Sequence, residues 1–301
     1  MSFNNELLPY PDSLIRELHY NNIRVGLNLT LDKIPGTIDG NQVEIPFNVY
    51  DKNFMMSYFN TIIKPLDDLG VDFYSLNYPG KDIYALRMIN YYFLNYLIKS
   101  KDKRGMILSK NGLVNSHLYP VYNSGETIVS WNTLKMLPEV NSTSSNIGVS
   151  WWSHAIGGYK NGVEESELYT RYVQFGTYSP IFRFASETGR FYKREPWQWD
   201  VKTEKIVKDY TNVRHKLIPY LYSEAYKYSK TGLPLLQPLY YRYPELYDEP
   251  NYKKEYYFGT ELFIVPITER KDTVMNRTVT KLFIPNGMWY DFKTGKKFPG
   301  G

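Results

Sequence analysis

Short apolar runs alternate with amphipathic stretches along the first 233 residues. The runs have the length of buried strands, and the stretches carry apolar residues three and four positions apart, as one face of a helix does. Strands are expected at 23–29, 71–77, 105–109, 147–152 and 181–184. Helices are expected to begin at 11 and to cover 51–70, 83–101, about 168–175 and 204–230, and the second should kink at Pro65. Strands that alternate with helices are typical of parallel α/β folds.

The pattern changes after Gly232-Leu233-Pro234, which ends the last helix. Short strands are expected at 235–243, 256–258, 262–266, 281–284 and 289–292, separated by Pro, Asn, Gly and Asp. The sequence therefore predicts two domains: 1–233, an α/β domain of the barrel kind, and 234–301, the start of an antiparallel β-domain. Two stretches lack a clear period, and we expect a long loop at 31–49 and strand with loop at 111–138.

Composition narrows the class of protein. With 301 residues, of which 43% are hydrophobic and 17% aromatic, the chain can bury a sizeable core. The net charge of +5 is spread along the chain, which argues against a nucleic-acid partner. There is no cysteine, and the four histidines form no zinc motif, so we expect neither a bound metal nor another cofactor. No run is apolar enough to span a membrane and no signal peptide is evident, which predicts a soluble, cytoplasmic protein.

The most informative stretch runs from Asn146 to Trp199, and its strand, turn, helix and strand order predicts a βαβ unit. It contains NIGVSWWSHAIGG, ELYTRYVQFGTYSPIFRFAS and REPW. These motifs resemble those of family 31 of the glycoside hydrolases, which run NIG..WWSHDIGG, ELY.RW.QFG.FSPI.R.HS and REPW. The resemblance covers nearly the whole chain and implies α-glycosidases of carbohydrate metabolism, of the α-glucosidase and α-xylosidase kind.

The resemblance also implies a fold, a (β/α)8 barrel of the TIM type followed by a β-domain. The run at 23–29 resembles the third barrel strand of the family. On that alignment the chain lacks the first two strands, and the C-terminal β-domain stops early. We therefore expect either a fragment or a partner chain that supplies the missing strands, since open strand edges favour association.

The departures from the family pattern fall on the chemistry. Retaining hydrolysis needs two carboxyl groups about 5 Å apart, a nucleophile and an acid/base. The family's nucleophile is the aspartate that ends the fourth strand, and Asn77 occupies that position. The family's acid/base belongs to an SGDT-like motif, which reads Ser-Gly-Glu-Thr here, with Glu126 at the acid position. An amide cannot form a glycosyl ester, and the longer glutamate misplaces its proton by roughly 1 Å. Asp72, earlier in the same strand as Asn77, is expected to be a buried structural acid.

The expected sugar contacts have changed as well. Ala155 replaces the aspartate of SHDIGG, Ala185 replaces the histidine of R.HS, and Lys110 stands where the family has an arginine. The remaining candidates for substrate binding are Lys110, Trp131, Trp152, His154 and Arg183. Because each altered residue follows a strand in the same direction, Asn77, Lys110, Glu126, Ala155 and Ala185 are expected to converge at one mouth of the barrel.

Three interpretations follow. The favoured one is a family 31-like pseudoenzyme that is impaired or inactive as a hydrolase. Its candidate ligand is an α-linked carbohydrate. The second is an active α-glycosidase that uses Glu126 as the acid and either another carboxylate or a substrate acetamido group in place of Asn77. The third is an interaction subunit that docks on an intact homologue.

Overall fold

The computed structural model describes residue 4 and residues 6–38, 40–101, 104–110, 115–119, 121–189 and 193–301. The chain forms two compact units, Met1–Asn123 and Ser124–Gly301. The domain boundary at 233/234 stays a prediction. None of the described helices is both long and apolar enough to cross a membrane.

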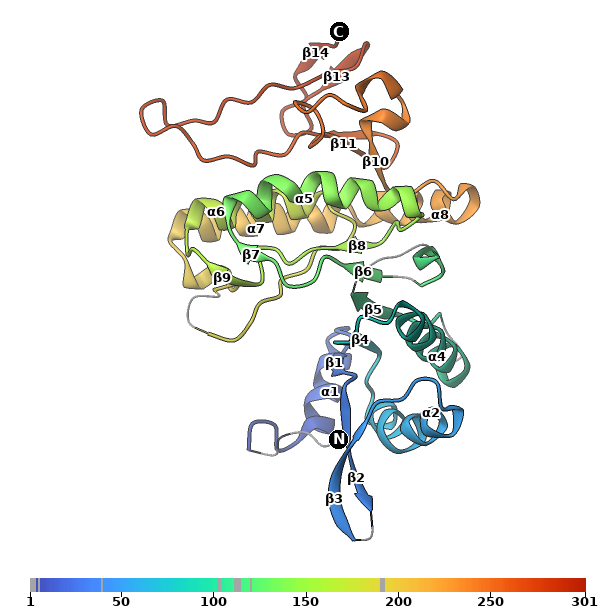
Figure 1. Ribbon diagram of the computed structural model, residues 1–301. Helices are drawn as coiled ribbons and strands as arrows, with labels where there is room; N and C mark the ends of the chain where they lie inside the picture. Colours follow the sequence, from blue (N-terminus) through green and yellow to red (C-terminus); the bar gives the residue numbers. More distant parts are fainter. Residues whose placement is uncertain are drawn as a thin grey trace. The chain divides into compact units, whose positions relative to one another are not determined.

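The first unit contains a parallel sheet. Its strands are β1 (Gly26–Thr30), β4 (Phe73–Asn77), β5 (Ile107–Lys110) and β6 (Val121–Asn123). Each pairs in parallel with the next, β1 with β4, β4 with β5 and β5 with β6 (Figure 1). Parallel strands end at the same edge of a sheet, and this edge carries the last residues of all four. The expected parallel α/β architecture is confirmed.

The helices of this unit are α1 (Pro11–Tyr20), α2 (Lys52–Tyr58), α3 (Lys64–Asp68) and α4 (Ile83–Lys101). They pack with the strands around a core that contains Tyr58, Ile63, Tyr74 and Phe93, all 2% exposed or less. The helix expected over 51–70 is confirmed as one uninterrupted helical run over 52–68, in which a π-helical turn, η1 (Phe59–Ile63), joins α2 to α3. Pro65 follows that turn and has no N–H to continue an α-helical ladder. Asp51 caps α2 as predicted, since its carboxylate accepts from two backbone N–H groups.

The loop expected at 31–49 is instead a hairpin of β2 (Lys33–Ile38) and β3 (Asn41–Pro46). Pro35 and Gly36 suggested a turn, yet both lie within a strand, where Gly36 pairs with Val43. A Cβ on Gly36 would lie 2.3 Å from Ile45 Cδ1, so the glycine makes room for that side chain. The actual turn lies between the two strands.

Asp72 has the structural role that was expected. Its side chain is 9% exposed, and Oδ2 accepts from the backbone N–H of Val25 at 2.9 Å. His19 Nε2 lies 2.8 Å from the same oxygen, and the Arg24 guanidinium lies 3.4 Å from Oδ1. These contacts tie α1 and the segment before β1 to β4, so Asp72 is a buried, hydrogen-bonded acid.

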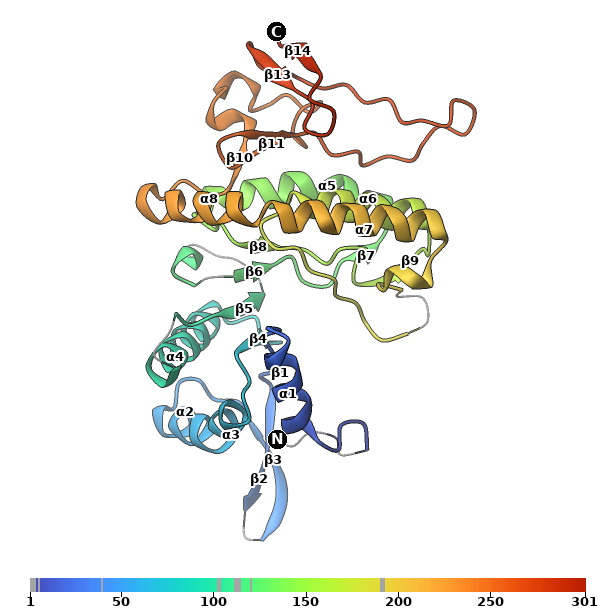
Figure 2. The same cartoon turned by 180° about the vertical axis from the view of Figure 1, so that it is seen from behind.

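The second unit begins with β7 (Ile128–Val129), β8 (Trp152–Ser153) and β9 (Lys160–Gly162). Figures 1 and 2 both show a layer of helices between these strands and the C-terminal strands. The layer consists of α5 (Trp131–Thr143), α6 (Ser166–Thr177), α7 (Val201–Lys216) and α8 (Ile218–Thr231). Parallel bridges join Ser153 to Ile181 and Ile156 to Phe184, which confirms the parallel βαβ arrangement.

Three expectations for this unit were wrong. The stretch 111–138 contains the start of α5, which Ser130 caps, and Pro138 inside that helix obscured its pattern. The single helix expected at 204–230 is broken at Leu217, because Pro219, the second residue of α8, has no N–H to donate to the preceding turn. Of the strand expected at 147–152, only Trp152 belongs to a strand, β8, whereas Ile147 ends a 3-10 turn, η3 (Ser144–Ile147), and Gly148 has a φ of +74°.

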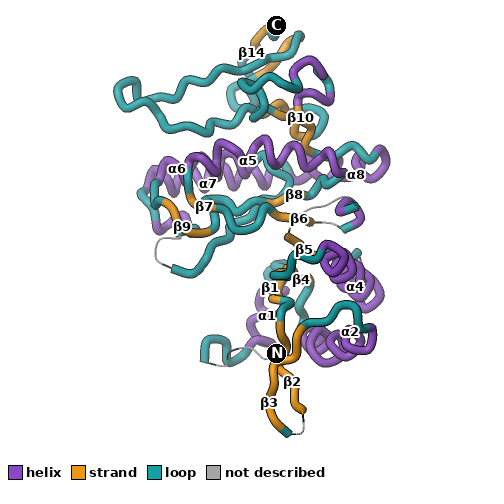
Figure 3. The backbone as a smooth tube through the Cα atoms, viewed as in Figure 1, coloured by secondary structure: helices purple, strands orange, loops and turns teal. Residues whose placement is uncertain are grey.

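The C-terminal part contains small antiparallel sheets, as predicted. One consists of β10 (Leu236–Pro238), β11 (Tyr256–Phe258) and β12 (Leu262–Ile264), and the other of β13 (Met288–Tyr290) and β14 (Lys297–Pro299). The strand expected at 281–284 is wrong: Figure 3 shows loop between β12 and β13. There the backbone N–H of Phe283 donates to Glu255 rather than to a strand.

Candidate functional site

The segment after β8 ends in a double-glycine turn. Gly157 and Gly158 have φ angles of +91° and +78°, which favour glycine, and the Gly158 N–H donates to the carbonyl of Ala155 at 3.0 Å. The Arg194 guanidinium donates to the carbonyls of Gly157 and Gly158 at 3.1 and 2.6 Å. Because the guanidinium bridges both carbonyls, the arginine of the REPW motif fixes the turn that follows His154 and Ala155.

His154 is completely buried beside this turn. Its Nδ1 lies 2.9 Å from the amide Nδ2 of Asn141, and its ring stacks on Phe175 at a centroid distance of 4.7 Å. Burial, together with the nearby positive charge of Arg183, lowers the pKa of His154 from 6.5 to about 3, so the ring is neutral. With the amide donating, Nδ1 accepts and Nε2 carries the proton. Nε2 has no hydrogen-bond partner among the described residues. Its contact with a sugar stays a prediction.

Arg183 and Trp152 add two further donors. Arg183 Nε donates to Ser153 Oγ at 2.9 Å, and burial lowers the pKa of the guanidinium from its usual value. The backbone carbonyl of Arg183 accepts from the Ile156 N–H, which holds the two segments together. Trp152 is 9% exposed, and its indole N–H lacks a partner in the described part of the chain. A buried donor without a partner costs stability unless a ligand or water satisfies it.

Glu126 is engaged in an ion pair. Lys160 Nζ lies 2.7 Å from Glu126 Oε2, and both side chains are about a third exposed. The pairing of β7 with β9 brings the two together, and the hydrogen bond to Glu126 raises the pKa of Lys160. A neighbouring ammonium favours the ionised carboxylate, whereas a general acid must carry a proton. Sequence reasoning missed Lys160, because nothing in the local pattern indicates its cross-strand partner.

Trp131 is the first residue of α5. Its indole Nε1 donates to Glu165 Oε2 at 3.0 Å, and Arg270 binds the same carboxylate at 2.7 Å. The Arg270 guanidinium lies 5.8 Å from the Trp131 ring centroid. This cluster holds the indole in place by its polar edge. Sugar stacking on the ring remains a prediction.

Asn77 and Lys110 belong to the first unit. They are the last residues of β4 and β5, adjacent parallel strands, and both are partly buried. The Asn77 carbonyl accepts from the Leu31 N–H at 2.9 Å, so the backbone at this strand end is fixed. Both residues thus stand at the carboxyl edge of the sheet. Their convergence with Glu126, Ala155 and Ala185 stays a prediction.

Comparison with known proteins identifies the family. Residues 55–224 match the glycosyl hydrolases family 31 TIM-barrel domain, and residues 232–301 match the glycosyl hydrolase family 31 C-terminal domain. The chain therefore belongs to glycosyl hydrolase family 31. Its fold is that of the family's barrel domain, with small antiparallel sheets of the C-terminal domain after it.

Individual relatives agree with this assignment. Neutral alpha-glucosidase C of Homo sapiens is 31% identical over 206 residues, which cover 67% of this chain and 22% of that protein. The isomaltosyltransferase of Sporosarcina globispora is 29% identical over 216 residues, which cover 69% of this chain and 19% of that protein. The chain thus spans about a fifth of the length of these two relatives.

Solved structures show the same fold. The cycloalternan-degrading enzyme from Trueperella pyogenes, in complex with isomaltose, superposes with a TM-score of 0.81 at 23% identity. The superposition covers 97% of this chain and 49% of that one. As for metals, the described residues contain no group of three or more His, Asp or Glu side chains able to hold an ion.

Proposed function

We propose that this chain is a family 31 α-glycosidase-like protein that binds α-linked carbohydrate and lacks ordinary hydrolase activity. The observation that carries the proposal is Asn77 at the carboxyl end of β4, where the family has its nucleophile. A neutral amide neither attacks the anomeric carbon nor balances the positive charge of an oxocarbenium-like transition state. By analogy with the removal of other catalytic residues, the loss costs on the order of 10⁴- to 10⁶-fold in rate.

The environment of Glu126 supports the same conclusion. Its carboxylate is paired with Lys160 at 2.7 Å, which stabilises the form that cannot donate a proton. A hydrolase that depends on Glu126 as an acid would have to break this pair or move Lys160 away. The pair therefore adds a second obstacle to the one at Asn77.

Binding is supported by the donors that remain. The Trp152 indole N–H and His154 Nε2 are buried and have no hydrogen-bond partner within the described residues. Arg183 adds a guanidinium from the segment that pairs in parallel with Ser153 and Ile156. Sugar hydroxyl groups accept hydrogen bonds of this kind. The isomaltose in the Trueperella pyogenes complex makes an α-linked gluco-oligosaccharide our first choice of ligand.

An active hydrolase with rearranged roles is the second candidate, because Glu126 still supplies a carboxyl group. Turnover of nitrophenyl α-glucoside and α-xyloside by the purified protein separates the two. We expect no turnover above that of the Asn77→Ala control. Ordinary turnover that Asn77→Ala leaves intact and Glu126→Gln abolishes would establish the second candidate.

Binding requires its own measurement. Isothermal titration with isomaltose and maltose should give a signal that Arg183→Gln weakens, while the exposed arginine variant Arg16→Gln on α1 should behave like the parent. If neither sugar binds the parent protein, the carbohydrate-binding part of the proposal is wrong.

A further inference from the structure

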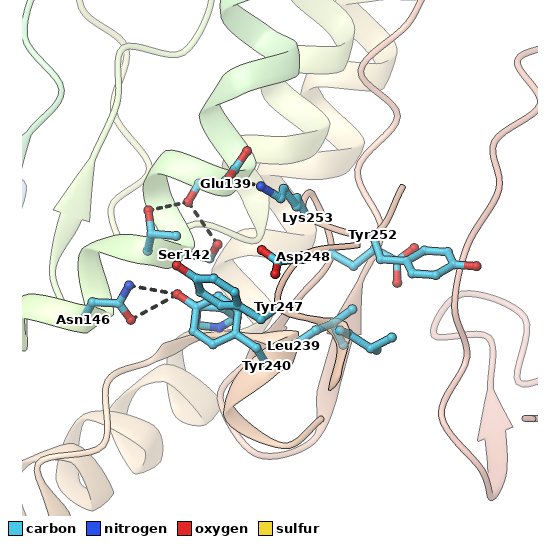
Figure 4. Close-up of a pocket in the computed structure, with 13 residues that line it drawn as sticks. Glu139, Ser142, Asn146, Leu239, Tyr240, Tyr247, Asp248, Tyr252 and Lys253 are labelled. Atoms are coloured by element: carbon cyan, nitrogen blue, oxygen red, sulfur yellow. Dashed lines mark hydrogen bonds and ion pairs between the residues drawn. The ribbon is translucent and has the colours of Figure 1, made fainter. Parts of the chain in front are cut away.

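A second concave site lies in the Ser124–Gly301 unit, between the C-terminal half of α5 and the segment that follows β10. The cavity has a volume of about 180 Å³. At ~30 Å³ per water molecule this is room for about six waters, comparable to one small ring with part of its substituents. None of the candidate site residues described above lines it. Figure 4 shows that aromatic and charged side chains surround the space.

Two tyrosines form an aromatic corner in this cavity. The rings of Tyr240 and Tyr247 meet edge to face, with centroids 5.1 Å apart and planes at 72°. Asn146 fixes Tyr240, because its Nδ2 donates to the tyrosine oxygen at 2.8 Å and the hydroxyl contacts Oδ1 at 3.1 Å. Tyr247 is 61% exposed, so its ring is available at the mouth. A rigid aromatic corner suits the flat C–H face of a small ring.

Side chains of both positive and negative charge surround the two tyrosines. Lys253 and Glu139 face each other at 3.7 Å, and Asp248 lies between Tyr247 and Lys253 (Figure 4). Glu255 forms part of the deeper wall and is 1% exposed. The Lys253 ammonium disfavours a cationic ligand, and the carboxylates of Glu139 and Asp248 disfavour an anion. Donors and acceptors are both present, so the chemistry selects a neutral ligand that carries several hydroxyl groups.

We propose that this cavity is an accessory carbohydrate site that takes one pyranose unit. The unit packs on the corner of Tyr240 and Tyr247, and vicinal hydroxyl groups donate to Asp248. The choice of sugar over another neutral polyol rests on the proposed function. A ligand of about a dozen heavy atoms held at modest efficiency corresponds to a dissociation constant on the order of 1 mM.

Titration of the full chain with methyl α-glucoside and maltose, followed by saturation-transfer NMR, tests the site. Tyr247→Ala removes one wall of the corner, and Asp248→Asn removes the acceptor charge while keeping the shape. Each change should weaken binding at least tenfold. Tyr222→Ala is the matched control, since Tyr222 is 78% exposed on α8 and lies outside the cavity. Circular dichroism should show all three variants folded, because these side chains are solvent-exposed.

The outcomes distinguish this site from the one near Arg183. The accessory site is supported if Tyr247→Ala and Asp248→Asn both weaken sugar binding and part of the binding remains in Arg183→Gln. Binding that only Arg183→Gln weakens overturns it and leaves the proposed function intact. Preferential binding of spermidine, again sensitive to Asp248→Asn, would make the cavity a cation site and the proposal wrong. Loss of all sugar signal from the parent protein overturns both.

Discussion

Glu255 should make the stability of this protein fall as the pH rises towards neutrality. The residue is almost completely buried, just before β11, and among the described residues its carboxylate accepts from the Phe283 N–H alone, at 3.1 and 3.3 Å. Burial raises the pKa of Glu255 from 4.5 to about 7, and the Phe283 hydrogen bond and Lys254 only partly oppose this rise. The protonated form is therefore the one that the fold prefers.

The sign of the effect follows from proton linkage. Between pH 4.5 and 7 the folded protein holds a proton on Glu255 that the unfolded chain has released. The contribution to the free energy of unfolding is complete below pH 4.5 and is lost as the pH rises to about 7. At ~1.4 kcal/mol per pH unit, the loss amounts to about 3 kcal/mol.

Urea denaturation between pH 4.5 and 8, followed by tryptophan fluorescence, measures this loss. Glu255→Gln keeps an acceptor for the Phe283 N–H and cannot ionise, so it should gain about 3 kcal/mol on the parent protein as the pH rises across this range. Glu245→Gln, an exposed glutamate on the same segment, is the control and should show no such gain. A stability difference between parent and Glu255→Gln that stays constant with pH would refute the reasoning.

Three further predictions concern the site. Arg194→Ala removes two charge-assisted hydrogen bonds from the turn at Gly157 and Gly158. In thermal or urea melts it should lower the free energy of unfolding by ~2–4 kcal/mol, and Arg194→Lys should fall between it and the parent. His154 is neutral because burial lowers its pKa to about 3. Its contribution to stability is therefore present above pH 6.5 and should be lost on acidification. In melts from pH 7 to 4, the His154→Gln variant should lose less stability than the parent. Asn77→Asp alone should leave turnover of nitrophenyl α-glucoside near undetectable, because residues that act as a unit do not contribute additively; turnover restored to ordinary enzyme rates would contradict this.

Elements with a strong apolar period were predictable. The helix at 83–101 and the strands that lead to Asn77 and Lys110 follow directly from residue spacing. The hairpin at 33–46 was missed because Pro35 and Gly36 are turn formers by themselves, and only the neighbouring Ile45 explains a glycine within the strand. Local propensity cannot report a contact with another strand.

The site divides in the same way. The positions of Asn77 and Lys110 at adjacent strand ends could be predicted, because parallel strands share an edge. Their partners could not: Glu126 meets Lys160, and Arg194 meets the double-glycine turn, only through tertiary pairing across more than thirty residues. The motifs indicated candidate residues, and the structure shows what several of them contact.

The strand register places Arg183, which matches the family motif, beside Ala155, which departs from it. The bridge between Ile156 and Phe184 is parallel, so Ala155 and Arg183 are also opposite each other in register. Arg183 is a partly buried cation with no carboxylate within ion-pair distance among the described residues, and it lies opposite Ala155, where the family motif has aspartate. A buried guanidinium without a counter-ion costs free energy. In the proposed function, sugar hydroxyl groups accept hydrogen bonds from Arg183 in place of the acid that the family motif has at position 155.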